Sequence, residues 1–454
     1  MRRTAALSET RDAKRRAGSE RWHARRFALC ASLVALCSSP FALRSQDTTR
    51  TQGVRIGLTY AAGTRPGVYV LPATGPTSDS VRTILARDLD YSDRLNVIAP
   101  DGGEMPPGAL NYPLYAQLGA VAVVQASVTP AGSLHVAVHD VAGARVLNVI
   151  DLVLPSPALG ADWRLAVHAA SDEIEKSVTG ERGIAQTRVL YEREQGIWIV
   201  DSDGANAHPI PNTHFGMSPA WHPGGRYAAY MELPNSGHQA IVVRDLSGKD
   251  PDRRFTARGT ANLTPTFSPD GSTLVFASGD DGTDLYAVDP FGTERPHRLT
   301  IGHETSTAGP TFSPDSRKIA FTSSRLGHPE VYITDADGTN PVLLTSSGIG
   351  EQSYRSDPDW SPDGRKVAFQ SLVNGMFQVM TINVRDQSVQ ALTSEGRNET
   401  PSWAPDSRHL VFTSDRSGVQ QLFVLDTESS KTRQLTHGTR ARLPAWSPQL
   451  EAAK

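Results

Sequence analysis

Apolar and polar residues alternate in many short segments through the second half of the chain. Segments such as STLVFAS at 272–278, KIAFTS at 318–323 and HLVFTS at 409–414 have a period of two, which is typical of half-buried β-strands. A Gly-containing turn and a second alternating segment follow in most units, for example DLYAVD at 284–289. Another turn and a short segment ending in Leu-Thr complete the unit. This pattern predicts four short antiparallel strands per unit.

A proline-rich motif with a central aromatic residue separates these units. Its copies are SPAWHPGG at 218–225, TPTFSPDG at 264–271, GPTFSPDS at 309–316, DPDWSPDG at 357–364, TPSWAPDS at 400–407 and LPAWSPQ at 443–449. The spacings between successive aromatics are 46, 45, 48, 43 and 43 residues. Four strands at a period near 45 residues predict the blades of a β-propeller. The aromatic side chain is expected to pack between neighbouring blades.

The arrangement of the units predicts how the propeller closes. Five units are complete, the sixth motif has no strands after it, and the segment 187–201 has strands without a preceding motif. These two fragments complete one blade, so the C-terminal strand should pair with the strands that open the propeller. Pairing of this kind removes the exposed sheet edges. We therefore expect an all-β six-bladed β-propeller over residues 181–454.

Residues 54–180 contain no repeat and predict an α/β domain. VRIGLTY at 54–60 resembles a strand, and the segment 78–89 places Val81, Ile84, Leu85 and Leu89 at helical spacing behind an Asp/Ser cap. A short helix near 112–118 leads into strands over 120–128, 134–140 and 145–154. A last helix carries its apolar face at Trp163, Val167, Ala170, Ile174 and Val178 and stops near Gly180. The predicted fold class is thus an α/β N-terminal domain followed by the propeller.

The first 45 residues have the pattern of a cleaved signal peptide. A basic cluster precedes an apolar stretch over 27–43, which is short for a membrane helix; an uncleaved anchor helix is the alternative. A flexible N-terminal segment, 46–53, would follow. Removing residues 1–45, which hold ten Lys and Arg but three Asp and Glu, takes the net charge from −3 to −10. That charge argues against nucleic acid and anionic membrane surfaces as partners. No second apolar span follows, so direct membrane insertion is not expected.

Catalytic and metal-binding signatures are weak in this sequence. Both cysteines, Cys30 and Cys37, fall in the predicted leader, so cysteine-based chemistry is excluded from the rest of the chain. Asp201-Ser-Asp203-Gly204 and Asp335-Ala-Asp337-Gly338 resemble the start of a calcium loop but lack its later ligands, and hairpin turns explain them. The strand pair His135 and His139 is expected to be a strand face rather than a metal site. We expect no catalytic residues, no metal and no cofactor.

Several segments together resemble the TolB family of the Tol-Pal system in the Gram-negative cell envelope. They are VRI at 54–56, the ARDL helix followed by LNVI, LGAVAVVQASVTPAGS at 118–133, SDEIEKSVTGERG at 171–183, TRVLY at 187–191, and the six motifs with the closing LPAWSP. The resemblance implies a monomeric, non-catalytic periplasmic scaffold. It would bind the lipoprotein Pal at the mouth of the propeller channel and TolA through its N-terminal segment, supporting outer-membrane integrity and envelope constriction during division.

The resemblance also implies which residues form the Pal-facing mouth. They belong to the loops just ahead of each inner strand, and their charges are mixed, which suits hydrogen bonding to a protein loop. The implied mouth residues are Met217, Asn262, Thr264, Ala308, Arg355, Asp357, Asn398, Glu399, Thr400, Arg440 and Arg442.

Two other classes of function remain open from the sequence. An exported propeller enzyme, either a hydrolase or a lyase, would need a GxSxG elbow or a cluster of acids and bases in the channel, and no GxSxG occurs. A glycan-binding propeller would need exposed aromatics at the mouth, whereas packing is expected to occupy the motif aromatics.

Overall fold

The computed structural model describes residues 64–100, 108–213, 215–234, 237–302, 305–345 and 354–451. The predicted signal peptide, the segment 46–53 and the strand predicted at 54–60 lie outside the described residues. No helix among the described residues is long and apolar enough to cross a lipid bilayer. The domain boundaries stay predictions, and below the elements from β1 to α3 are called the α/β domain and those from β6 to β29 the propeller.

The α/β domain is a five-stranded mixed sheet with the order β2-β1-β3-β4-β5. β1 pairs in parallel with β2 and β3, whereas β3, β4 and β5 are antiparallel. The elements are β1 (Gly67–Val70), α1 (Ser78–Tyr91), β2 (Asn96–Ile98), α2 (Tyr112–Gln117), β3 (Ala120–Val128), β4 (Ser133–Asp140), β5 (Arg145–Val153) and α3 (Ala161–Thr179).

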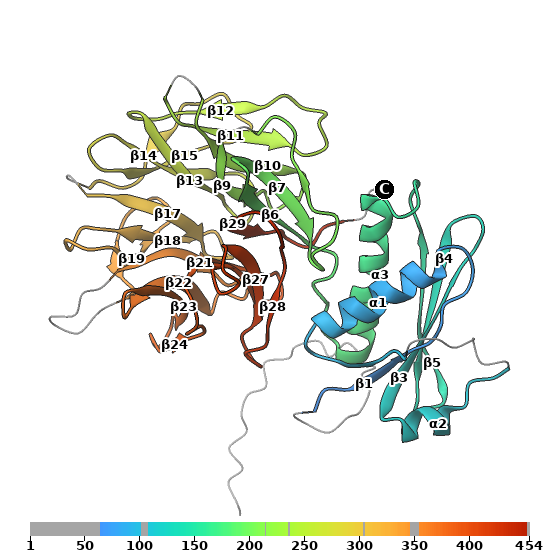
Figure 1. Cartoon of the computed structure of the whole chain (residues 1–454). Helices are drawn as coiled ribbons and strands as arrows, with labels where there is room; N and C mark the ends of the chain where they lie inside the picture. The colour runs from blue at the N-terminus through green and yellow to red at the C-terminus, as the bar shows by residue number, and fades with distance from the viewer. Residues whose placement is uncertain are drawn as a thin grey trace, which may run out of the picture. The chain divides into compact units, whose positions relative to one another are not determined.

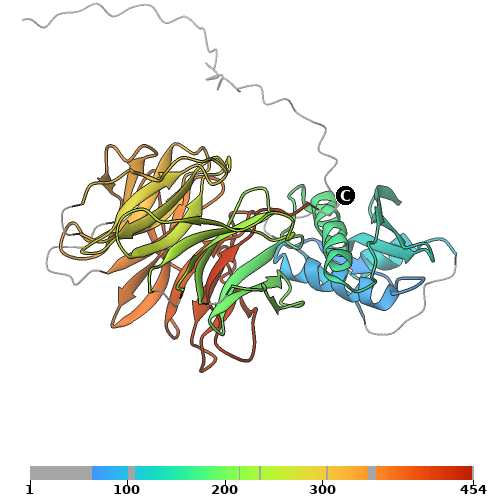
Figure 2. The same cartoon turned by 90° about the horizontal axis from the view of Figure 1, so that it is seen from above.

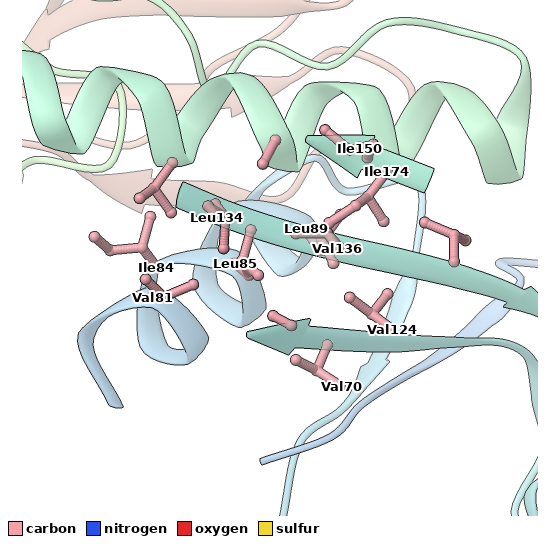
Figure 3. Close-up of a cluster of buried hydrophobic side chains, with 14 of the residues drawn as sticks. Val70, Val81, Ile84, Leu85, Leu89, Val124, Leu134, Val136, Ile150 and Ile174 are labelled. Carbon is pink, nitrogen blue, oxygen red and sulfur yellow. The ribbon is translucent and has the colours of Figure 1, made fainter. Parts of the chain in front are cut away.

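The core of the α/β domain lies between its sheet and the helices α1 and α3. Figure 3 shows Leu85 and Leu89 of α1 and Ile174 of α3 gathered with sheet residues such as Val124 and Val136. All nine apolar positions predicted on the two helix faces are buried. The predicted cap of α1 is wrong, because Thr77 precedes the helix at φ 56° and its side chain makes no capping bond. The α3 helix ends at Gly180, whose φ of 83° favours glycine.

The propeller consists of six four-stranded antiparallel sheets. Figure 1 shows them following one another around a common axis in colour order from green to red, and Figure 2 shows them from above. The strands are β6 (Arg188–Arg193), β7 (Gly196–Asp201), β8 (His208–Pro209), β9 (Gly216–Trp221), β10 (Tyr227–Glu232), β11 (Ala240–Asp245), β12 (Arg253–Phe255), β13 (Ala261–Phe267), β14 (Leu274–Gly279), β15 (Asp284–Val288), β16 (His297–Arg298), β17 (Thr307–Phe312), β18 (Lys318–Ser323), β19 (Glu330–Asp335), β20 (Val342–Leu343), β21 (Arg355–Trp360), β22 (Lys366–Val373), β23 (Met376–Asn383), β24 (Val389–Ala391), β25 (Asn398–Trp403), β26 (His409–Ser414), β27 (Gln421–Asp426), β28 (Thr432–Gln434) and β29 (Arg442–Trp446).

The two ends of the propeller sequence share one sheet, as predicted. Its strand order is β29-β6-β7-β8, and Trp446 of the last strand lies opposite Val189 of the first. The chain end therefore supplies the inner strand of a sheet whose other three strands come first in the propeller. Closure of this kind leaves no unpaired inner strand among the described sheets.

The motif aromatics pack between neighbouring sheets, which confirms their predicted role. Phe312 lies in a cluster with Val275 of the preceding sheet, and Trp403 lies with Val379 of the preceding sheet. Trp221, the one half-buried member of the six, packs against apolar residues of β6 and β7. The turn after each of the first five aromatics is closed by a hydrogen bond such as that from Gly271 N to Ser268 O, 2.8 Å. Gly271 has a φ of 74°, which favours glycine at this position of the turn.

A bulge before a proline recurs in every inner strand. The residue before the motif proline has a positive φ in all six strands, and the pairing register shifts there. The six residues, with φ between 46° and 59°, are Ser218, Thr264, Gly309, Asp357, Thr400 and Leu443. An extra residue in a strand re-aims the side chains around it, and all six of these residues line the central channel.

Candidate functional site: the mouth and channel of the propeller

The channel runs between the inner strands β9, β13, β17, β21, β25 and β29. It encloses about 430 Å³, and its wall is formed by the bulge residues, the prolines that follow them and the motif aromatics. We call the end where the inner strands begin the mouth. Because neighbouring strands are antiparallel, the second strand of each sheet ends at the mouth and the third strand begins there.

The eleven predicted mouth residues occupy three kinds of position. Thr264, Asp357 and Thr400 are bulge residues and line the channel. Asn262 and Asn398 are fully buried, so they offer no surface at the mouth. The remaining six lie at or near the starts of inner strands, and they are Met217, Ala308, Arg355, Glu399, Arg440 and Arg442.

The structure corrects the expectation that these residues lie in loops ahead of the inner strands. Ten of them belong to the inner strands themselves, and Arg440 alone of the eleven lies in a loop. The reason is the pre-proline bulge. It lets each inner strand pair with its neighbour on both sides of the extra residue, as in the pairs Ala261 with Gly279 and Thr266 with Val275.

The two buried asparagines have a structural role. Asn262 accepts a bond from Ala257 N at 3.0 Å and donates to Gln239 O at 2.9 Å. Asn398 donates to Gln378 Oε1 at 2.8 Å and accepts from Arg416 Nη2 at 2.9 Å. These bonds hold loops at the mouth in place, and they use the donors and acceptors that a partner would need.

Five acidic groups near the mouth are paired with arginines. Arg355 Nη1 lies 3.3 Å from Glu330 Oε1, and Arg397 Nε donates to Glu399 Oε1 at 2.7 Å. Three further pairs join Arg254 to Glu232, Arg298 to Asp284, and Arg442 to Glu192. At these five positions an acidic and a basic side chain neutralise each other.

Two aspartates of β21 are the ionisable side chains among the described residues that line the channel. Burial raises the pKa of Asp359 to about 6, although Trp403 N donates to its carboxylate at 2.6 Å and Thr311 Oγ1 does so at 3.2 Å. Burial also raises the pKa of Asp357, against the effect of a hydrogen bond from Ser356, and the charge of Glu399 adds to the rise. Neither aspartate has a histidine or lysine beside it in the channel wall.

Exposed apolar side chains that the sequence did not predict lie around the mouth. Seven large apolar residues there are between 39% and 73% exposed. They lie where second strands end, third strands begin or fourth strands lead into the next sheet. They are Phe215, Leu233, Ile301, Leu326, Tyr354, Met376 and Val419, and we call them the apolar rim.

Arginines stacked on aromatic rings stiffen the same surface. The guanidinium carbon of Arg325 lies 4.6 Å from the ring centre of Tyr332, and that of Arg416 lies 5.0 Å from the ring centre of Phe423. Such contacts hold a long side chain in one place and stabilise it by about 1 kcal/mol. The sequence carries a signal for these two, because FTSSRLG at 321–327 and FTSDRSG at 412–418 place an arginine at the same position of two units.

Comparison with known families tests the resemblance seen in the sequence. The model of the family described as the TolB beta propeller domain matches residues 175–450. The chain belongs to this TolB propeller family. Curated TolB relatives named Tol-Pal system protein TolB, from the Haemophilus influenzae strains PittEE and PittGG, are each 30% identical over 206 residues. Those residues make up 41% of this chain and 46% of each relative, so the match spans about half the length of these TolB proteins.

A solved TolB structure shares the fold over most of the chain. The crystal structure of TolB from Acinetobacter baumannii superposes with a TM-score of 0.72 at 24% identity. The superposition covers 85% of this chain and 97% of that TolB. Both the propeller and the α/β region before it therefore match the TolB architecture.

Proposed function

We propose that this protein is the TolB component of a Tol-Pal system, a non-catalytic periplasmic scaffold that binds Pal at the propeller mouth. Its segment 46–53 would bind TolA, and the assembly would support outer-membrane integrity and envelope constriction during division. Family membership supports the Tol-Pal role, and the names of the Haemophilus relatives support the system. The apolar rim is the observation that carries the assignment of the mouth.

The rim suits a protein partner better than a small polar ligand. Interfaces between proteins combine an apolar centre with a polar border, and they are enriched in aromatic residues, Met and Arg. The mouth supplies Met376, Tyr354 and Phe215 as well as stacked arginines and paired charges. Burial of several such side chains would provide affinity, and the paired charges would provide orientation.

The channel favours binding over catalysis. Its two aspartates lie on one strand, and among the described residues of its wall no histidine or lysine accompanies them. Acid–base chemistry needs a donor and an acceptor on opposite sides of a substrate. We therefore propose that the channel, like the apolar rim, has a binding role and not a catalytic one.

Calorimetric titration with the soluble domain of Pal from the same organism tests this proposal. Leu326→Ser and Met376→Ser each remove an apolar contact from the rim, where these side chains are 56% and 54% exposed. Each change should weaken the binding of Pal about tenfold, or ~1.4 kcal/mol. Val342→Ser is the matched control, because Val342 is 62% exposed on the outer strand β20. Equal affinities for all four proteins would contradict the placement of the site.

A further inference from the structure

Two fully buried histidines lie where the α/β domain contacts the propeller. His168 belongs to α3, and His409 begins β26. Each histidine directs one ring nitrogen to a carboxylate of its own domain and the other ring nitrogen to a carboxylate of the other domain. The arrangement is reciprocal, because one histidine comes from each side of the contact.

His168 reaches from the α/β domain toward the propeller. Its Nδ1 lies 2.7 Å from Asp88 Oδ2 of α1, which also accepts a bond from Ser171 Oγ at 2.7 Å. Its Nε2 lies 3.8 Å from Asp203 Oδ2 and 4.0 Å from Asp201 Oδ2, at the end of β7 and in the turn that follows. Nε2 has no hydrogen-bond partner of its own. The ring nitrogen that faces the propeller is therefore held by charge alone.

His409 reaches from the propeller toward the α/β domain. Its Nδ1 lies 2.7 Å from Asp406 Oδ2 of the preceding turn, and its Nε2 lies 3.5 Å from Asp93 Oδ2, just after α1. Arg408 Nη2 donates to the backbone oxygen of Asp93 at 3.1 Å, and Lys431 Nζ lies 2.9 Å from Asp93 Oδ1. Three basic residues of the propeller, Arg408, His409 and Lys431, thus contact Asp93 of the α/β domain.

Charged groups of both signs face each histidine from every element around it. Around His168 they are Arg87 and Asp88 of α1, Arg164 of α3, Arg188 of β6, Asp201 and Asp203 of the β7 end, and Arg433 of β28. Around His409 they are Arg65, Asp93 and Arg94 of the α/β domain, and Asp406, Arg408, Asp426, Glu428 and Lys431 of the propeller.

A proton fits these sites better than a metal ion does. The ligand atoms of Asp88, His168 and Asp203 lie within 4.8 Å of one another, and so do those of Asp93, His409 and Asp426. The propeller carboxylates already bind guanidinium groups, however, since Arg164 contacts both Asp201 and Asp203, and Arg408 holds Asp426 at 2.7 Å. A divalent ion would add two charges beside these cations, whereas a proton adds one.

The charge on each imidazole decides whether its contact with the carboxylate of the other domain is attractive or repulsive. With a neutral ring whose proton is on Nδ1, the lone pair of Nε2 faces the carboxylate of the other domain. With a charged ring, an N–H faces that carboxylate. Because the two sites are closed to solvent, water and salt only weakly screen this change from repulsion to attraction.

We propose that His168 and His409 form a proton-operated clamp between the α/β domain and the propeller, closed when both rings are charged and loosened when they lose their protons. Burial opposes the charged form of His168, but the charge and hydrogen bond of Asp88 prevail and raise its pKa. Burial likewise opposes the charged form of His409, but the hydrogen bond to Asp406 and the contact with Asp93 raise its pKa. A raised histidine pKa means that the stabilisation is complete below about pH 6.5 and is lost as the pH rises through the raised pKa.

Two neighbouring carboxyl groups act in the same direction and must be separated from the clamp. Burial raises the pKa of Asp172 to about 7, and burial also raises the pKa of Glu175 to about 7. Both belong to α3, and Glu175 pairs with Arg94 at 3.1 Å. Because these acids are also favoured in their protonated form, they too would weaken the contact as the pH rises. Variants of the histidines distinguish the two causes.

Distances between two spin labels, one on each domain, test the clamp when they are measured by electron–electron double resonance. The chain from residue 46 keeps every described residue and contains no cysteine, so Ser133→Cys and Ser417→Cys place one spin label on an exposed position of each domain. Between pH 5.5 and pH 8.5, a second distance population should grow at least fivefold. In the double variant His168→Gln, His409→Gln, that population should already be present at pH 5.5 and should change less than twofold. His208→Gln, on the exposed outer strand β8, is the matched control and should respond as the unsubstituted chain does.

Two results would overturn the proposal. One is an unsubstituted chain whose distances do not change with pH. The other is a double variant that keeps the full response, which would assign it to groups such as Asp172 and Glu175. If the double variant fails to fold, the imidazole resonances of the unsubstituted chain, assigned with the single variants, decide the question. Titration of His168 and His409 above pH 6.5 supports the clamp, and titration at or below that value contradicts it.

Discussion

Trp446 and Thr187 lie at opposite ends of the propeller sequence and are joined by a hydrogen bond. The indole Nε1 of Trp446 donates to Thr187 Oγ1 at 2.8 Å, and both side chains are buried. The same tryptophan pairs through its backbone with Val189 and packs against Val411 and Leu422 of the neighbouring sheet. One residue thus joins the last strand to the first and fills the space beside them.

Trp446→Ala should destabilise the propeller by about 3 to 5 kcal/mol, because it leaves a cavity at the closure and removes the donor to Thr187. Thr187→Val removes the acceptor for Trp446 and the hydroxyl that donates to Ile184 O at 2.6 Å. It leaves no large cavity and should cost about 1 to 3 kcal/mol. Urea unfolding followed by circular dichroism measures both changes. A loss below about 1 kcal/mol for Trp446→Ala would show that closure does not limit stability.

Asp359→Asn should change how stability depends on pH. The pKa of Asp359, about 6 in the folded chain, is above the ordinary value of 3.8, so the folded state favours the protonated acid. The stability that this group contributes is therefore complete below about pH 4 and lost as the pH rises through 6. Relative to the unsubstituted chain, Asp359→Asn should gain about 2 to 3 kcal/mol between pH 4 and pH 8. A constant difference in urea midpoint across that range would contradict this account.

Asn398→Ala should weaken folding without a direct effect on partner binding. The change removes the bonds to Gln378 and Arg416 and leaves buried polar groups unpaired, at a cost of about 2 to 4 kcal/mol. The affinity for Pal, measured by calorimetry well below the unfolding temperature, should stay within about threefold. A large loss of affinity with unchanged stability would show that Asn398 takes part in binding Pal.

The fold could be predicted from the sequence because its signals are local and repeated. The six aromatics at near-constant spacing indicated the sheets, and the unmatched sixth motif indicated that Trp446 would join the first strands. In the α/β domain, the helical spacing of residues such as Leu85 and Ile174 indicated which faces would be buried. Each of these patterns needs only the periodicity of one element.

The site was harder to predict because its geometry depends on conformation and on distant contacts. Thr400 and Leu443 adopt a positive φ that neither residue favours, so the bulges that turn them into the channel leave no trace in composition. Asn398 resembles a surface residue until Arg416 and Gln378 are placed around it. The turn at Asp201 and Asp203 was correctly expected to be a hairpin, yet its contact with His168 joins separate domains and has no local signal.

Hydrogen–deuterium exchange of the protein with and without the soluble domain of Pal tests the central claim most directly. Binding at the mouth predicts slower exchange in the segments that carry the apolar rim, above all around Leu326, Met376 and Val419. The outer strands β20 and β24 should exchange at the same rate in both samples. Protection confined to the outer strands or to the sheet of the α/β domain, or none at saturating Pal, would contradict a partner site at the mouth.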